Sequence, residues 1–173
     1  MKVFDDQQQR FVRLCLYQVG QLDRALAQAR EASRLYPSPH SYAGLITLEL
    51  LTDRLDEADA RLAEADAQKF DSLFLRIRRA NLAFLRHDNS KLQEQWAWAE
   101  GKPDAEFRML WLRGFTEAYY GHYRNFRALL AQARELAIKE SDLSCIVRIS
   151  SDYSLIEAEA GNLTEALQLV EQG

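Results

Sequence analysis

The 173-residue sequence predicts an all-α protein built from about five consecutive helical hairpins. Apolar residues recur with the period of an α-helix almost from end to end, and alternating strand patterns are scarce. Only seven Gly and three Pro interrupt this pattern. Turn residues break it at nearly regular intervals. We therefore expect a soluble, well-packed helical chain and neither a disordered nor a fibrous one.

The turns divide the sequence into five units, at approximately 6–39, 40–70, 71–103, 104–140 and 141–173. The first unit turns at Gly20 and ends before Tyr36-Pro37-Ser38-Pro39, because proline lacks an amide donor and restricts the residue before it. The later units turn at 52–54, 86–90, Gly121 and 161–162. In the third turn we expect Asp88, Asn89 or Ser90 to cap the helix that contains Trp96.

Aligning the units on their turns brings one position of each second helix into register, with spacings of 33, 34, 34 and 40 residues: Ala25, Ala58, Leu92, Phe126 and Ala166. A period of 34 residues in helix-turn-helix units is typical of the tetratricopeptide repeat. In the first unit, Gly20, Ala25, Ala32 and Pro37 fall at the glycine, alanine and proline positions of that repeat, and the chain resembles a degenerate member of the family. Leu92 and Phe126 replace the expected small residue, and the spacing of 40 implies an insertion or longer helices near 137–145.

The tetratricopeptide resemblance implies a right-handed αα-superhelix whose concave face is lined by the first helices of the units. It also implies a protein or peptide as the ligand. The segments 82–106 and 116–137 resemble the repeat regions that follow the catalytic or winged-helix domain of some bacterial serine/threonine kinases and transcriptional regulators. Two interpretations stay open: an interaction module that acts alone, or the sensor or regulatory tail of a longer signalling protein.

The composition and motifs argue against several functions. A net charge of −4 and a pI near 5.5 disfavour nucleic acid as a partner, and no apolar run is long enough to span a membrane, so a cytoplasmic location is expected. The sequence contains no phosphate loop, nucleophile elbow or kinase motif, and we expect no enzyme activity and no cofactor. Cys15 and Cys145 are expected to be reduced, buried thiols, and His40, His87 and His122 lack metal-ligand spacing.

The charged residues are uneven along the chain. Acidic residues dominate 49–66, and basic residues dominate 69–91. Two explanations are open: either these helices have solvated faces or pair with one another, or the basic section forms a concave patch for an acidic peptide.

The candidate binding residues lie on the first helices of three units, where the resemblance implies a shared groove: Tyr17, Gln18, Arg78, Asn81, Phe84, Arg113 and Tyr120. Arg10 and Leu14 stand where some tetratricopeptide domains carry the Lys and Asn of a carboxylate clamp, so that clamp is not expected. Trp98 is offset from the apolar stripe of Trp96 and is a further candidate. The stripe of Leu163, Ala166, Leu167 and Val170 has no polar cap after it, which predicts a chain that continues or a weak homo-oligomer.

Overall fold

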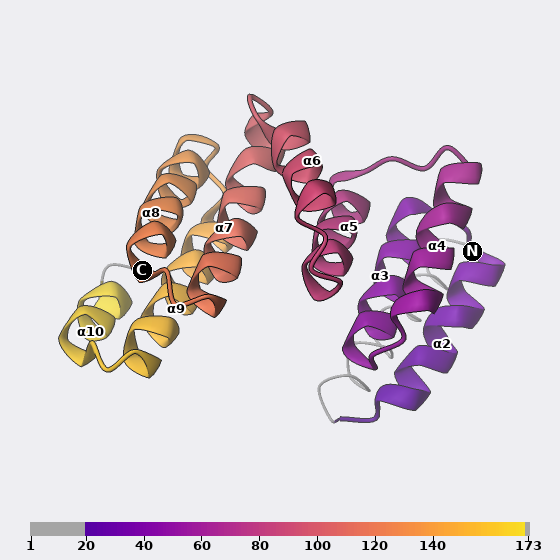
Figure 1. Cartoon of the computed structure of the whole chain (residues 1–173), viewed down its shortest axis with the longest axis horizontal. Helices are drawn as coiled ribbons and strands as arrows, with labels where there is room; N and C mark the ends of the chain where they lie inside the picture. Colours follow the sequence, from indigo (N-terminus) through magenta and orange to yellow (C-terminus); the bar gives the residue numbers. More distant parts are fainter. Residues whose placement is uncertain (1–19, 172–173) are drawn as a thin grey trace. The chain divides into compact units, whose positions relative to one another are not determined.

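The protein is all-helical over the range that the computed structural model describes, which is residues 20–171, with side chains to residue 169. This range contains nine α-helices and no strand, and Figure 1 labels the helices along the chain. They are α2 (Leu22–Leu35), α3 (Pro39–Leu51), α4 (Leu55–Ala67), α5 (Leu73–Leu85), α6 (Asn89–Ala99), α7 (Pro103–Tyr119), α8 (Tyr123–Lys139), α9 (Leu143–Glu159) and α10 (Leu163–Glu171). The predicted all-α class is confirmed.

The chain divides into two compact units, Met1–Leu92 and Gln93–Gly173. The division falls within α6. In the first unit α3 packs against α2, α4 and α5, and α4 also packs against α5. In the second unit α8 packs against α7 and α9, and α10 packs against α9. Each unit therefore contains helical hairpins that bury their own core.

The turns contain residues with a left-handed backbone conformation: Gly20, Asp53, Lys69, His87, Gly101, Gly121, Ser141 and Gly161. Asp53, His87 and Gly121 follow one another at intervals of 34 residues. In the turns that follow a described helix, the backbone amide of the residue after the left-handed one donates a hydrogen bond to a carbonyl of that helix. The amide of Arg54, for example, donates to the carbonyl of Glu49 at 2.8 Å. The predicted turns at 52–54, Gly121 and 161–162 are therefore confirmed as helix boundaries, and the turn predicted at 86–90 is shorter, because α6 begins at Asn89. Gly20 precedes α2, and the helix predicted before it lies outside the described residues.

Several helices begin with a side-chain cap. The carboxylate of Asp88 accepts from the amide of Lys91 at 3.0 Å, so one of the three expected caps of α6 is confirmed. Ser38 and Ser41 form a reciprocal capping box at the start of α3. Asp142 accepts from the amide of Cys145 at the start of α9. These caps pair amides that a helix leaves without an internal acceptor.

The position aligned from the sequence is buried in α2, α4, α6, α8 and α10, including the helices where a large residue replaces the small one: Ala25 0%, Ala58 0%, Leu92 7%, Phe126 0% and Ala166 5% exposed. The spacing of 40 comes from longer helices, since α7, α8 and α9 each contain 17 residues, whereas α3, α4 and α5 contain 13. Only residues 140–142 separate α8 from α9, so the inserted-loop alternative was wrong.

Gly114 marks a close approach of α7 to α8. A Cβ at this position would lie 2.1 Å from Cδ1 of Leu130, which is itself fully buried beside Phe126 in the core of the second unit. Glycine is therefore required here by packing, because any larger side chain would displace Leu130.

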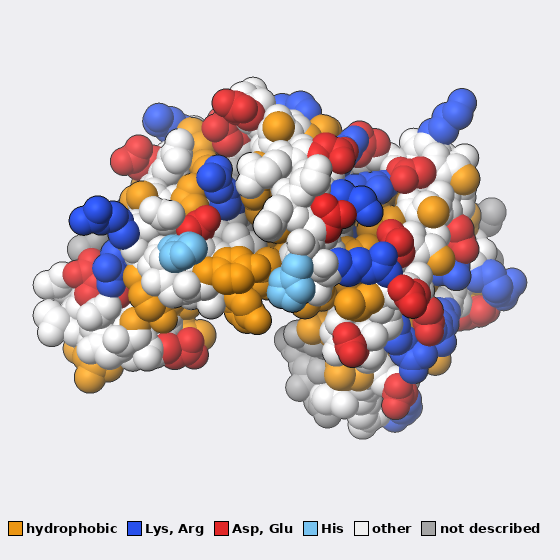
Figure 2. Space-filling view, viewed as in Figure 1, with side chains coloured by type: hydrophobic (Ala, Val, Ile, Leu, Met, Phe, Trp, Pro, Cys, Tyr) orange, Lys and Arg blue, Asp and Glu red, His pale blue; other side chains and the backbone are white. Residues whose placement is uncertain are grey.

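The acidic and basic sections of the sequence meet in the first unit. Arg86, the C-cap of α5, pairs with Asp56 and Asp59 of α4 at 2.6 and 2.9 Å, and Arg79 of α5 pairs with Asp66 at 2.5 Å. In Figure 2, acidic and basic side chains lie interspersed over the surface of this unit. Pairing between the two sections is therefore confirmed for these helices.

The C-terminal stripe is partly exposed. Leu163 and Leu167 are 64% and 66% exposed, whereas Ala166 is buried against α9. Val170 lies outside the described side chains. Cys145 is buried and free, as expected, and Cys15 lies outside the described residues.

Candidate functional site

The candidate groove residues occupy different environments. Arg78, Asn81 and Phe84 lie at i, i+3 and i+6 on α5 in the first unit, and all three are half-buried. Tyr17 and Gln18 lie outside the described residues. The α5 residues thus share a helical stripe, as the spacing predicted, but a binding role for them stays a prediction.

Arg113 and Tyr120 lie on and beside α7 in the second unit. Tyr120, the C-cap of α7, is exposed, and its ring lies 5.3 Å from that of Tyr119 and 6.2 Å from that of His122. Arg113 is half-buried and lines a pocket of about 340 Å³ between α6, α7 and α8. Of the α7 candidates, Arg113 is therefore the one that lines this cavity.

The Arg113 pocket has mixed chemistry. Trp96 of α6, Met109 and Leu110 of α7 and Leu129 of α8 supply apolar surface. Glu100, Glu106, Gln93 and Gln132 supply polar groups, and no described residue forms an ion pair with the Arg113 guanidinium. A half-buried cation beside an indole and aliphatic side chains can hold a ligand group that combines an apolar body with a carboxylate or carbonyl oxygen.

The other two tryptophans have partners within the chain. The ammonium of Lys102 lies 3.9 Å from the centroid of the Trp98 ring and donates to the Trp98 carbonyl. The guanidinium of Arg148 lies 5.2 Å from the Trp111 ring, which packs against the core of the second unit. Cation–π contacts account for these positions without a ligand.

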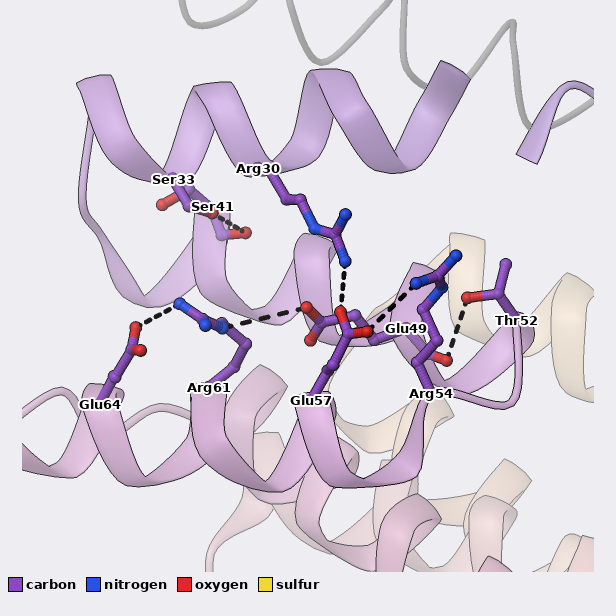
Figure 3. A network of polar contacts seen from close by, with 9 residues as sticks. All are labelled: Arg30, Ser33, Ser41, Glu49, Thr52, Arg54, Glu57, Arg61 and Glu64. Carbon is purple, nitrogen blue, oxygen red and sulfur yellow. Dashed lines mark hydrogen bonds and ion pairs between the residues drawn. The ribbon is translucent and has the colours of Figure 1, made fainter. Parts of the chain in front are cut away.

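The sequence did not reveal a buried glutamate in the first unit. Glu49 lies in the last turn of α3 and is 1% exposed. Figure 3 shows its side chain between α2 and α4, with Arg30 reaching from α2 and Arg61 from α4. The Nε of Arg61 lies 3.9 Å from Oε1 of Glu49, too far for a hydrogen bond, and Oε2 has no hydrogen-bond partner.

The basic groups around Glu49 are directed to other carboxylates. Arg30 pairs with Glu57, Arg54 also pairs with Glu57 at 3.1 Å, and Arg61 pairs with Glu64 at 2.6 Å (Figure 3). Burial raises the pKa of Glu49 to about 7; the Arg61 charge lowers it and the Glu57 charge raises it further. Near neutral pH this carboxyl exists in both protonation states.

Three glutamates occupy the same place in their helices. Glu49, Glu117 and Glu157 each stand four residues before the left-handed residue of the turn. Glu157 is fully buried, receives two hydrogen bonds from Arg127 at 2.6 and 2.8 Å and one from Asn162 at 2.7 Å, and the Arg127 bonds lower its pKa. Glu117 accepts from Asn125 at 2.9 Å. Of the three, only Glu49 lacks a hydrogen-bond donor for its carboxyl group among the described residues.

The sequence around Glu49 does not distinguish a buried glutamate from a solvent-exposed one. It stands among Leu48, Leu50 and Leu51 and is the single Asp, Glu, Lys or Arg residue of its helix. Such a residue at a helix end is usually solvated. Its burial depends on α2 and α4, which flank α3 from both sides.

The described range holds no site of two further classes. No group of three or more His, Cys, Asp or Glu that could hold a metal ion occurs there. None of its helices combines the length and hydropathy needed to cross a membrane. Comparison with family models, curated proteins and solved structures found no match to this chain.

Proposed function

We propose that this chain is a non-catalytic interaction module that binds a protein or peptide ligand, with the Arg113 pocket as the principal binding site. The observation that carries the proposal is a half-buried guanidinium without an ion-pair partner among the described residues, in a cavity beside Trp96. Trp and Arg are the residue types that contribute most binding energy at protein interfaces.

The pocket chemistry indicates the kind of ligand. The apolar lining can accommodate an aliphatic or aromatic side chain of the ligand. The Arg113 guanidinium can donate hydrogen bonds to a carboxylate or main-chain carbonyl close to that side chain. Glu100 and Glu106 at the same pocket disfavour a strongly acidic ligand. A peptide with one apolar anchor next to one oxygen acceptor fits these requirements.

The test is a selection of peptides from a random library, followed by affinity measurements on purified variants. Arg113→Gln and Trp96→Ala should each weaken the selected peptides by about tenfold or more, since loss of a central interface residue costs at least 1–2 kcal/mol. Arg124→Gln is the matched control, because Arg124 is exposed on α8 and lies outside the pocket lining.

Arg78→Ala and Tyr120→Ala extend the test to the other candidate residues, with Lys91→Ala as their control. A loss of affinity in both would support the longer groove that the tetratricopeptide resemblance implies. Peptides that bind Arg113→Gln and Trp96→Ala as tightly as the unmodified chain, while both variants keep their helical content, would remove the pocket as the ligand site.

A further inference from the structure

A second pocket, of about 370 Å³, lies in the first unit and is independent of the Arg113 pocket. We call it the arginine pocket. Its lining comes from α2, α3 and α4: Arg30, Ser33, Arg34, Tyr42, Leu45, Arg61 and Glu64. Arg30 projects from α2 and Arg61 from α4, on opposite sides of α3 (Figure 3). Three guanidinium groups therefore border one cavity in a protein whose net charge is −4.

The arginine pocket is lined mainly by hydrogen-bond donors. Besides the three arginines, Tyr42 lines it, and this residue is only 6% exposed. The Tyr42 oxygen accepts a hydrogen bond from Nε2 of Gln68 at 2.5 Å, which leaves the hydroxyl proton available for donation. Ser33 is satisfied by the Ser41 carbonyl, and Glu64 is the one carboxylate in the lining.

A ligand can replace the glutamate partners of the three arginines with little loss of stability. Arg30 pairs with Glu57, Arg34 with Glu31 and Arg61 with Glu64, and each of these glutamates is more than 40% exposed. Ion pairs exposed to this degree contribute little to stability. Each guanidinium of the lining thus has one carboxylate partner, and an anionic ligand binds there by replacing the exposed Glu57, Glu31 and Glu64 as the acceptor of these donors.

We propose that the arginine pocket binds the phosphate group of a phosphate monoester. A carboxylate has two oxygens in one plane, which a single guanidinium satisfies, whereas a phosphate has three oxygens that accept donors arriving from α2, α3 and α4. The volume is that of a site for a small organic ligand and exceeds the needs of phosphate alone. The rest of the ester occupies the space over Leu45.

Glu49 controls this site. It lies one helical turn beyond Leu45 on α3, and Arg61 both lines the pocket and lies 3.9 Å from Glu49. Its unpartnered, buried Oε2 lies in the same polar network. When Glu49 is protonated, Arg61 is available to the ligand; when it is ionised, its charge competes for Arg61 and repels an anion.

The charges that act on Glu49 come from both flanking helices. They are Arg30 on α2 and Glu57, Arg61 and Glu64 on α4. Arg54, in the turn, is held by Glu57. No charged group of α5, which also packs on α3, is among those that shift Glu49 within the described range. Since the arginines stay charged at all relevant pH values, the ionisation of Glu49 itself makes the affinity fall between about pH 6 and pH 8.

The first experiment is isothermal titration calorimetry with O-phosphoserine and with inorganic phosphate. We expect O-phosphoserine to bind, and Arg34→Gln and Arg61→Gln each to weaken it by about tenfold, the effect of losing a hydrogen bond to a charged group. Arg24→Gln removes the same charge from an exposed residue of α2 outside the pocket and should change affinity less than about twofold. Equal binding of inorganic phosphate would identify the free ion as sufficient; tighter binding of O-phosphoserine would identify the ester.

The second experiment uses sulfate, which stays a dianion throughout this pH range. Binding to the unmodified chain should weaken by about threefold to tenfold from pH 6 to pH 8, and binding to Glu49→Gln should not change. No binding of either phosphate compound at millimolar concentration, equal weakening by Arg24→Gln, or succinate binding more tightly than phosphoserine would overturn the proposal. An identical pH dependence in Glu49→Gln would overturn the role of Glu49. Arg34 is 67% exposed on its side chain, so its variant keeps the test valid if Arg61→Gln fails to fold.

Discussion

Replacing Glu49 with Gln should stabilise the protein, and the gain should grow with pH. The folded-state pKa of Glu49 is raised from 4.5 to about 7. Below pH 4.5 the carboxyl is protonated in both the folded and the unfolded chain and has no effect on their balance. As the pH rises, the unfolded chain ionises first, so stability falls until the folded chain also ionises above pH 7.

The size of the effect follows from the shift. Each unit of pKa corresponds to 1.36 kcal/mol, so a rise from 4.5 to about 7 corresponds to about 3 kcal/mol lost from the free energy of unfolding above pH 7. Glutamine has nearly the same shape and no charge. We therefore expect Glu49→Gln to gain about 1–3 kcal/mol at pH 8 and almost nothing at pH 4.5, the lower value allowing for the polar amide that stays buried.

The assay is urea unfolding at several pH values, followed by circular dichroism and by tryptophan fluorescence. Trp96, Trp98 and Trp111 all lie in the second unit, so fluorescence reports that unit, while circular dichroism reports both. The gain in Glu49→Gln should appear in the dichroism signal.

Glu157→Gln is the matched control, at the same place in α9. The pKa of Glu157 is lowered, so its stabilising effect is present above the unfolded value and is lost as the pH falls. This variant should lose about 1–3 kcal/mol at pH 8, because hydrogen bonds to a charged group are removed. A Glu49→Gln variant that is destabilised at pH 8, or whose effect is the same at pH 4.5 and pH 8, would refute the reasoning.

Two further predictions concern the scaffold. Asp88→Ala should lower the free energy of unfolding by about 0.5–2 kcal/mol, because it removes the cap of α6; thermal or urea unfolding measures the loss. Asp88→Asn can still cap the helix and should lose less stability. Equal losses in the two variants would argue against capping. Gly114→Ala should lower the free energy of unfolding by about 1–3 kcal/mol, because the new Cβ would overlap Leu130. Adding Leu130→Ala in the same chain should recover part of that loss. If the effects of the two substitutions simply add in the double variant, the two side chains do not meet.

The helices and turns were predictable because their signals are local. The helical period, the proline pair at 37–39 and the small turn residues each act within a few positions of the chain, and the observed helices begin and end where those signals stand. The aligned position was also predictable. Even Phe126, which departs from the small residue of the repeat, is fully buried there.

The candidate sites depended on contacts between distant segments. Arg113 was selected for its place on a first helix, but the pocket beside it requires Trp96 and Leu129 from two other helices. Glu49 was counted within an acidic section, since nothing in its neighbours along the chain indicates that α2 and α4 enclose it. The pairing of Arg86 with Asp56 and Asp59 spans about thirty residues and was one of two open explanations.

The glutamates four residues before the turns show how such a chain can diversify. One backbone position holds a carboxyl group whose proton affinity depends on a residue of another helix: Arg127 donates to Glu157, whereas Glu49 has no equivalent hydrogen-bonding partner in the part of the chain that the structure describes. A single substitution about thirty positions away therefore changes the proton affinity of a buried carboxyl group. Variation of this kind alters the acid–base behaviour of a hairpin while its own sequence, its turn and its helix boundaries stay the same.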